Sequence, residues 1–171
     1  MNRICVLAIS IIMMYCFSVI MHQTLIELPP TDEGVSQIKW ISLSYNGYEK
    51  EKEAIINYYQ RAFEIIRIVK DKSPDEVPIA VGYYDFNHDG VDEIITFISD
   101  TEFHGAKDSG GLYVLKYDGK VINGENSIAG FQLDTLTLND PRSKQIGVIY
   151  NEEGWDDLYI NGLKWKTAID S

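Results

Sequence analysis

The sequence has no cysteine after Cys16 and no methionine after Met21, although it continues to Ser171. Both cysteines lie in an apolar segment near the start, so the remainder of the chain has no disulfide to stabilise it. A bound metal ion is another common way to stabilise a small domain. The core must be built from Ile, Leu, Val, Tyr, Phe and Trp, and these residue types favour a β-rich core.

Catalytic motifs are also scarce. The three histidines, His22, His88 and His104, have a spacing that matches no zinc motif. The sequence contains no GxSxG nucleophile motif and no phosphate-binding glycine loop. It therefore indicates no catalytic residue and favours a protein that is not an enzyme.

The sequence contains few positively charged residues. Its 15 Lys and Arg against 26 Asp and Glu give a net charge of −11 at pH 7. Removal of Arg3 with the N-terminal segment would leave 14 basic residues and a net charge of −12. Such a charge disfavours nucleic acid and anionic membranes as partners. It speeds encounter with a basic protein, although solubility alone would also account for it.

Residues 4–21 (ICVLAISIIMMYCFSVIM) carry no charge and follow Arg3, which is typical of an export signal. A helix of about 18 residues is about 27 Å long, near the lower limit for spanning the hydrocarbon core. Small residues at Cys16 and Ser18 favour cleavage after Ser18, and retention as a membrane anchor is the alternative. We therefore expect an exported protein of the periplasm or cell envelope, attached to the membrane only if residues 4–21 remain.

The apolar segment and the composition after it divide the chain into three predicted parts. Residues 1–21 are a predicted signal peptide or signal anchor. Residues 22–35 contain two prolines and no sustained period, so they are a predicted linker. Residues 36–171 have a length and apolar content that suit a single domain.

Residues 48–71 have the clearest helical pattern. Apolar side chains recur there at spacings of four, three, four and three, and they form one stripe that we expect to pack on a sheet. The stripe consists of Ile55, Tyr59, Ala62, Ile66 and Val69. The sequence thus predicts one long amphipathic helix.

The other patterned segments predict strands separated by turns, among them a hairpin across Asp118 and Gly119. The predicted strands are 78–84, 94–99, 112–117, a segment from 120, 131–138, 143–150 and 157–160, and residues 37–43 are a short strand or a lead-in to the helix. A helix followed by five to seven mostly antiparallel strands predicts an α+β fold, with the long helix packed on the sheet. One loop repeat cannot close a propeller, which needs at least four blades.

Residues 85–93 (DFNHDGVDE) place oxygen-bearing side chains at alternate positions. Calcium takes six to eight oxygen ligands, and Gly90 permits the sharp turn that such a loop needs. The predicted ligands are the side chains of Asp85, Asn87, Asp89 and Glu93 and the backbone carbonyl of Val91, with Asp92 as an alternative to Glu93. An EF-hand is excluded, because its twelfth position is Thr96 within an apolar run. The alternative is a surface turn in which Asp and Asn cap their own backbone.

A DxNxDGxxE loop between strands resembles those of FG-GAP and VCBS repeats. It is also similar to the loop of small exported bacterial proteins that carry it once, followed by a glycine-rich segment and a GWxDL motif. The matching residues here are 105–115 (GAKDSGGLYVL) and 154–158 (GWDDL), and the resemblance covers about residues 77–160. Relatives often carry a cysteine pair around the glycine-rich segment, which is missing here. The resemblance implies an immunity protein or an inhibitor of cell-wall hydrolases.

Three further residues are candidates for partner binding: Glu102, His104 and Trp155. Residues 99–111 are polar and form a loop long enough to bind a partner, and Trp155 could anchor one or seal a sheet edge. His88 occupies an intervening position of the 85–93 loop, where side chains usually face solvent.

The favoured hypothesis is an exported calcium-binding, non-catalytic binding protein, such as an inhibitor or immunity protein against a basic cell-wall hydrolase. One alternative is a structural envelope protein whose fold calcium stabilises. Another is an envelope hydrolase that uses the 99–111 loop, with Glu102 and His104 as acid and base.

Overall fold

The computed structural model describes residues 38–103, 110–131 and 144–169, together with residues 133, 138, 140 and 142. By its internal contacts the chain divides after Val35, and all described residues belong to the part Ser36–Ser171. The predicted signal segment and linker lie outside them. None of the described helices is long and apolar enough to cross a membrane.

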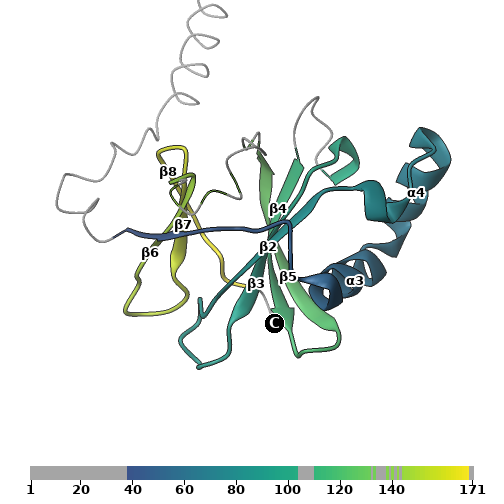
Figure 1. The fold of residues 1–171 in the computed structure, drawn as a ribbon. Coiled ribbons are helices and arrows are strands. Elements are labelled where there is room, and N and C mark those ends of the chain that lie inside the picture. The colour runs from purple at the N-terminus through teal and green to yellow at the C-terminus, as the bar shows by residue number, and fades with distance from the viewer. Residues whose placement is uncertain are drawn as a thin grey trace, which may run out of the picture. The chain divides into compact units, whose positions relative to one another are not determined.

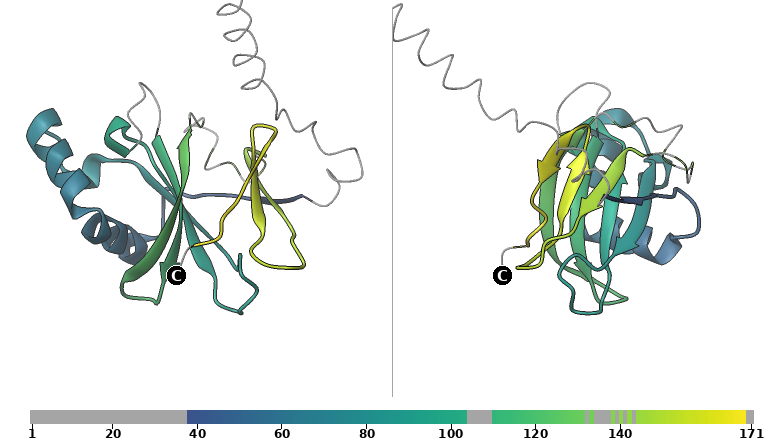
Figure 2. Two further views of the ribbon diagram at one scale, coloured as in Figure 1. Left: turned by 180° about the vertical axis from the view of Figure 1, so that it is seen from behind. Right: turned by 90° about the vertical axis from the view of Figure 1, so that its left-hand side faces the viewer.

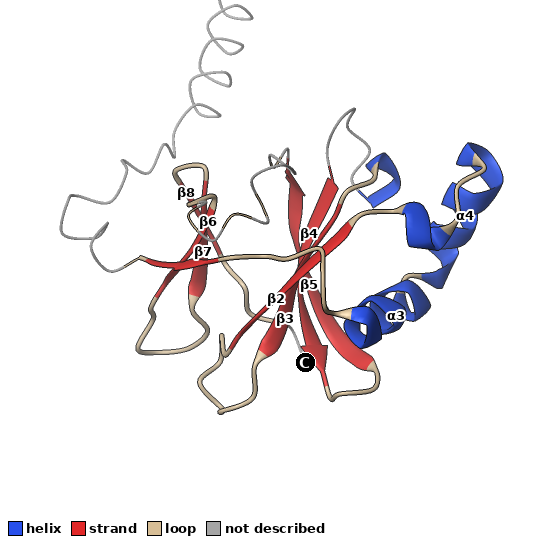
Figure 3. Ribbon diagram, in the orientation of Figure 1, coloured by secondary structure: helices blue, strands red, loops and turns tan. Residues whose placement is uncertain are grey.

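Two antiparallel sheets of four strands each form the larger part of the regular secondary structure among the described residues (Figure 3). Sheet A has the spatial order β1 (Lys39–Ile41), β6 (Ile146–Ile149), β7 (Asp157–Ile160) and β8 (Leu163–Trp165). Sheet B has the order β2 (Ile79–Tyr84), β3 (Glu93–Ile98), β4 (Gly110–Tyr117) and β5 (Ile122–Phe131).

Sheet B lies between sheet A and two α-helices, α3 (Glu49–Tyr58) and α4 (Gln60–Lys70), as Figure 1 and the reverse view in Figure 2 show. Two short 3-10 helices, η1 (Pro74–Glu76) and η2 (Thr101–Phe103), precede β2 and follow β3. One apolar cluster fills the space between the two sheets, and a second lies between sheet B and the helices.

The sequence of β3 explains the central position of sheet B. Successive side chains of a strand point to opposite faces of its sheet. Ile95 and Phe97 pack in the cluster that faces sheet A, whereas Ile94 and Ile98 pack in the cluster that faces the helices. All six residues of β3 are buried, because both faces of the strand are covered. Burial of each Ile or Phe side chain of this strand stabilises the fold by about 1.5 to 3 kcal/mol.

The predicted fold class is wrong in two respects. First, residues 48–71 form two short helices, because the backbone at Tyr59 (φ −96°, ψ 28°) leaves the helical region. The Tyr59 ring packs against Phe103 and Tyr113 at centroid distances of 5.5 and 5.1 Å, and its hydroxyl donates to the Glu125 carboxylate. These contacts lie far along the chain, so local helical periodicity does not record them.

Second, the strands do not form one sheet of five to seven strands. The early strand β1 pairs with β6, which places Trp40 opposite Gly147, and β7 and β8 extend that pair. The C-terminal strands therefore build a second sheet instead of adding to sheet B. The regular secondary structure of the described residues is thus mostly β, with two sheets packed through an apolar layer.

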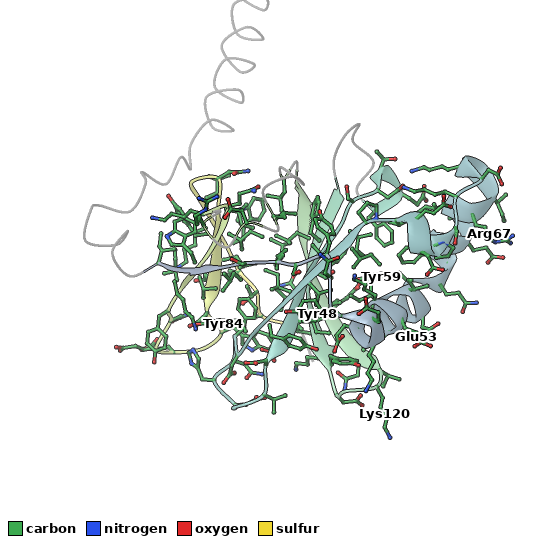
Figure 4. All side chains as sticks on the ribbon, viewed as in Figure 1. Tyr48, Glu53, Tyr59, Arg67, Tyr84 and Lys120 are labelled. Carbon is green, nitrogen blue, oxygen red and sulfur yellow. The ribbon has the colours of Figure 1, made fainter. Side chains whose placement is uncertain are left out.

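The predicted apolar stripe is only partly buried. Ile55 and Ile66 are fully buried, but the Val69 side chain is 73% exposed. The break at Tyr59 changes the course of the chain, and Figure 4 shows the neighbouring Arg67 at the outer end of α4. The prediction that Val69 packs on a sheet is therefore wrong.

Candidate metal-binding loop

The 85–93 loop joins β2 to β3 at one end of sheet B. Asp85 directly follows the last residue of β2, and Glu93 is the first residue of β3. Two residues have left-handed backbone conformations, His88 with φ 60° and Gly90 with φ 85°. Glycine adopts this conformation without a steric cost, so Gly90 allows the tight turn that returns the chain to β3.

The side chains of Asp85, Asn87 and Asp89 organise the loop backbone. The Asp85 carboxylate accepts hydrogen bonds from the backbone N–H groups of Asp89 (3.1 Å) and Gly90 (2.9 Å). Asn87 Oδ1 also accepts from Asp89 N at 2.9 Å, and Asp89 Oδ1 accepts from Val91 N at 2.8 Å. These bonds hold the three side chains over the loop. Each carboxylate oxygen has a second lone pair that such bonds leave unused.

Glu93 joins this group from the start of β3. Its residue is only 4% exposed, and Oε2 accepts from Phe86 N at 2.9 Å. Oε1 accepts from Asn87 Nδ2 at 2.9 Å, and the same amide donates to Asp89 Oδ2 at 3.0 Å. Asn87 therefore bridges two carboxylates. The structure thus brings the four predicted side-chain ligands into one hydrogen-bonded cluster.

The electrostatics of the cluster disfavour negative charge on Glu93. The pKa of Glu93 is raised from 4.5 to about 6. Burial is the largest cause, the hydrogen bond from Phe86 N acts in the opposite direction, and the negative charges of Asp89 and Asp85 add to the rise. Burial and like charges both penalise the ionised carboxylate. A cation among these groups would offset both penalties.

The donor set consists of oxygen atoms, which suits a hard cation such as calcium. Among the residues that the structure describes, however, no three His, Cys, Asp or Glu side chains converge into a ready metal site. The carboxylates are instead held apart by the N–H donors of the loop and of Asn87. The chemistry of the residues fits calcium, and the geometry equally matches the self-capped turn that the sequence left as an alternative.

The remaining predicted ligands lie at the rim. The Val91 side chain is 59% exposed, and its backbone N–H is bonded to Asp89. Asp92, the alternative to Glu93, is exposed and lines an open depression of about 250 Å³ with Lys116 and Asp118 of the β4–β5 hairpin. Glu93, not Asp92, is the carboxylate that the structure joins to Asn87.

Asp156 is a residue of the site that the sequence did not indicate. It is fully buried, and Oδ1 lies 3.0 Å from His88 Nε2 within the loop. Tyr84, the residue before Asp85, donates its hydroxyl to Asp156 Oδ2 at 2.7 Å. The GWDDL motif contains Asp156 and was the one available signal, but nothing in it specifies which carboxylate turns toward the loop. His88 therefore does not simply face solvent, because only 34% of its side chain is exposed.

Of the three candidate partner-binding residues, the structure describes Glu102 and Trp155, and these two lie in different parts of the fold. Glu102 lies in η2, beyond the end of β3 that is remote from the loop, and its N–H donates to Asp100 Oδ1 at 2.9 Å. Trp155 lies beside Asp156, packs against the cluster between the sheets, and has Lys116 Nζ 5.4 Å from the centroid of its ring. His104 lies outside the described residues.

Comparison of the chain with protein-family models, with curated proteins and with solved structures finds no match.

Proposed function

We propose that this protein is an exported, calcium-binding, non-catalytic binding protein whose partner is a basic protein of the cell-wall hydrolase class. The observation that carries the calcium proposal is the cluster of Asp85, Asn87, Asp89 and Glu93, in which a buried carboxylate lies beside two others. Three carboxylates near one another repel, and a divalent cation removes that repulsion.

The proposal of a basic partner is supported by charge. The chain has a net charge of −11, and a field of this sign accelerates encounter with a positively charged protein. The apolar segment 4–21 after Arg3 supports export to the compartment in which cell-wall hydrolases act.

A second candidate is a structural envelope protein in which calcium only stabilises the fold. The observation that favours it is the connection of the loop to both sheets. Phe86, within the loop, is fully buried, and its carbonyl accepts from Asp156 N at 2.7 Å. An ion that rigidifies this loop would stabilise the packing of the sheets without any partner.

Calcium binding is tested by the thermal melt of the full-length chain in calcium, in magnesium and in chelator. At calcium tenfold above its dissociation constant, the gain is about 1.4 kcal/mol, which raises the melting temperature by several degrees. The Asp85→Asn and Asp89→Asn double variant should lose this rise, because it removes two charges. Asn keeps one acceptor oxygen at each position, so one of the two hydrogen bonds that each side chain accepts can remain.

The matched control is a Glu49→Gln and Glu53→Gln double variant, which removes two negative charges from exposed positions of α3. It should keep the full calcium-dependent rise. Identical melting of the wild type in calcium and in chelator would make the loop a self-capped turn and remove the calcium proposal.

Partner binding is tested separately, by titrating the chain into a panel of purified basic cell-wall hydrolases and measuring lytic activity. We expect inhibition that weakens as ionic strength rises, because screening reduces attraction between exposed charges. Calcium-dependent melting combined with no inhibition and no binding across the panel would favour the structural candidate instead.

A further inference from the structure

The Asp156 carboxylate connects three separate parts of the fold. It is fully buried, and it accepts hydrogen bonds from the Tyr84 hydroxyl at the end of β2 and from Asn151 N, at 2.7 Å each. The imidazole of His88, inside the 85–93 loop, lies 3.0 Å from the same carboxylate. Figure 4 shows Tyr84 on the side of sheet B that faces sheet A, where this contact forms. A buried carboxylate with such partners is costly to leave unpaired, so it strongly fixes their positions.

The backbone provides a second connection through Phe86. Its N–H donates to Glu93 Oε2 at 2.9 Å, and its carbonyl accepts from Asp156 N at 2.7 Å. The Thr167 hydroxyl in turn donates to the Asp156 carbonyl. One fully buried residue of the loop therefore bonds a predicted calcium ligand on one side and the start of β7 on the other.

His88 shows that the loop conformation depends on these contacts. A non-glycine residue with φ 60° is disfavoured by about 1 kcal/mol or more. The Asp156 contact and the Tyr150 ring, at a centroid distance of 5.0 Å, hold the imidazole in place. His88 lies between Asn87 and Asp89 along the chain, so contacts that hold His88 restrain the backbone that carries both of these side chains.

We propose that Asp156 is a positioning residue for the metal-binding loop, and that calcium binding in the loop is coupled through it to the 151–156 segment, which connects β6 to β7 of sheet A. This inference rests on the calcium binding proposed above. Coupling between sites is reciprocal. Asp156 therefore strengthens calcium binding, and bound calcium in turn orders the Asn151 and Asp156 backbone.

Asp157 provides a matched control one residue away. Its side chain is 8% exposed, and it pairs with Lys164 Nζ of β8 at 2.8 Å, within sheet A. Asp157 is thus a buried carboxylate at the first position of β7, and it forms its ion pair within sheet A. Loss of this ion pair reduces stability without reaching the 85–93 loop.

The first measurement is calcium affinity by isothermal titration calorimetry on the full-length wild type, Asp156→Asn and Asp157→Asn. Residues that orient metal ligands typically change metal affinity by about 10- to 100-fold when replaced. We expect a loss of about tenfold or more in Asp156→Asn and a change within about twofold in Asp157→Asn. If Asp156 has only a structural role, the folded Asp156→Asn and Asp157→Asn variants should bind calcium with equal affinity. Thermal melts in chelator will show whether both variants are folded.

The second measurement is amide hydrogen exchange with and without calcium. In the wild type and in Asp157→Asn, calcium should slow exchange at Asn151 and Asp156, which lie outside the loop. In Asp156→Asn this distant protection should be lost. If Asp156→Asn does not fold, His88→Asn serves instead, because Asn tolerates the left-handed conformation but is too short to keep the carboxylate contact.

The outcomes separate the two proposals. A wild-type chain that binds no calcium by calorimetry overturns the calcium proposal and this one with it. Wild-type binding with unchanged affinity and unchanged amide protection in Asp156→Asn or His88→Asn overturns the positioning role of Asp156 alone.

Discussion

In the calcium-free protein, Glu93 should make the folded state less stable as the pH rises. Burial, with Asp89 and Asp85 nearby, raises the pKa of Glu93 from 4.5 to about 6, so the folded state holds this proton more tightly than the unfolded state does. Stability therefore falls with pH wherever the folded state binds more protons. The contribution of Glu93 is fully present below about pH 4.5 and is lost as the pH rises through about 6.

The size of the effect follows from the difference between the two pKa values. A difference of about 1.5 pH units, at about 1.4 kcal/mol per unit, corresponds to about 2 kcal/mol in the free energy of unfolding. Glu93 is only 4% exposed, so solvent screens little of this effect. Calcium should reverse the sign, because the metal binds the ionised carboxylate and its affinity rises with pH.

The assay is urea unfolding in calcium-depleted buffer at several values between pH 4.5 and 7.5. The wild type is compared with Glu93→Gln, which cannot titrate, and with Glu53→Gln, which removes an exposed carboxylate on α3. The difference in unfolding free energy between wild type and Glu93→Gln should change by about 2 kcal/mol over this range. Parallel pH profiles of these two proteins would refute the reasoning, and Glu53→Gln should follow the wild type.

Two further predictions compare matched positions by urea unfolding. Ile66→Ala should lower the free energy of unfolding by about 2 to 5 kcal/mol, because Ile66 is fully buried. Val69→Ala, at a position that is 73% exposed, should change it by less than about 0.5 kcal/mol. Equal losses in the two variants would contradict the exposed placement of Val69. Gly90→Ala should lower the free energy of unfolding by about 1 to 2 kcal/mol and weaken calcium binding, because φ is 85° at this position. Gly154→Ala should have little effect, because an added Cβ there meets nothing within 4 Å. Unchanged stability of Gly90→Ala would argue against the left-handed turn.

Local chemistry explains which parts of the fold the sequence predicted well. The apolar segments around residues 85–93 predicted a strand on each side, and β2 and β3 lie there. The turn itself depends on contacts between residues two to five positions apart, such as Asp85 with Gly90. Interactions over so few residues are encoded by residue type and spacing, without knowledge of the rest of the chain.

Contacts distant in sequence account for the errors. The helical period of residues 48–71 continues through Tyr59. The contacts that accompany the break there, between the Tyr59 ring and Phe103 and Tyr113 and between its hydroxyl and Glu125, are distant in sequence. Strand pairing also depends on contacts that are distant in sequence. About a hundred residues separate β1 from β6, and the sequence of neither strand indicates that the two pair. The separation of the strands into two sheets followed from that pairing.

The sequence by itself determined the acidic charge, the apolar segment 4–21 and the alternating oxygen-bearing side chains of the 85–93 loop, because each is a property of composition or of neighbouring residues. Only the tertiary structure decided that Glu93 is buried and that Asp156 turns toward His88. The physical reason is burial: a carboxylate removed from water must find donors, and the donors for Asp156 come from residues both near it and far from it along the chain.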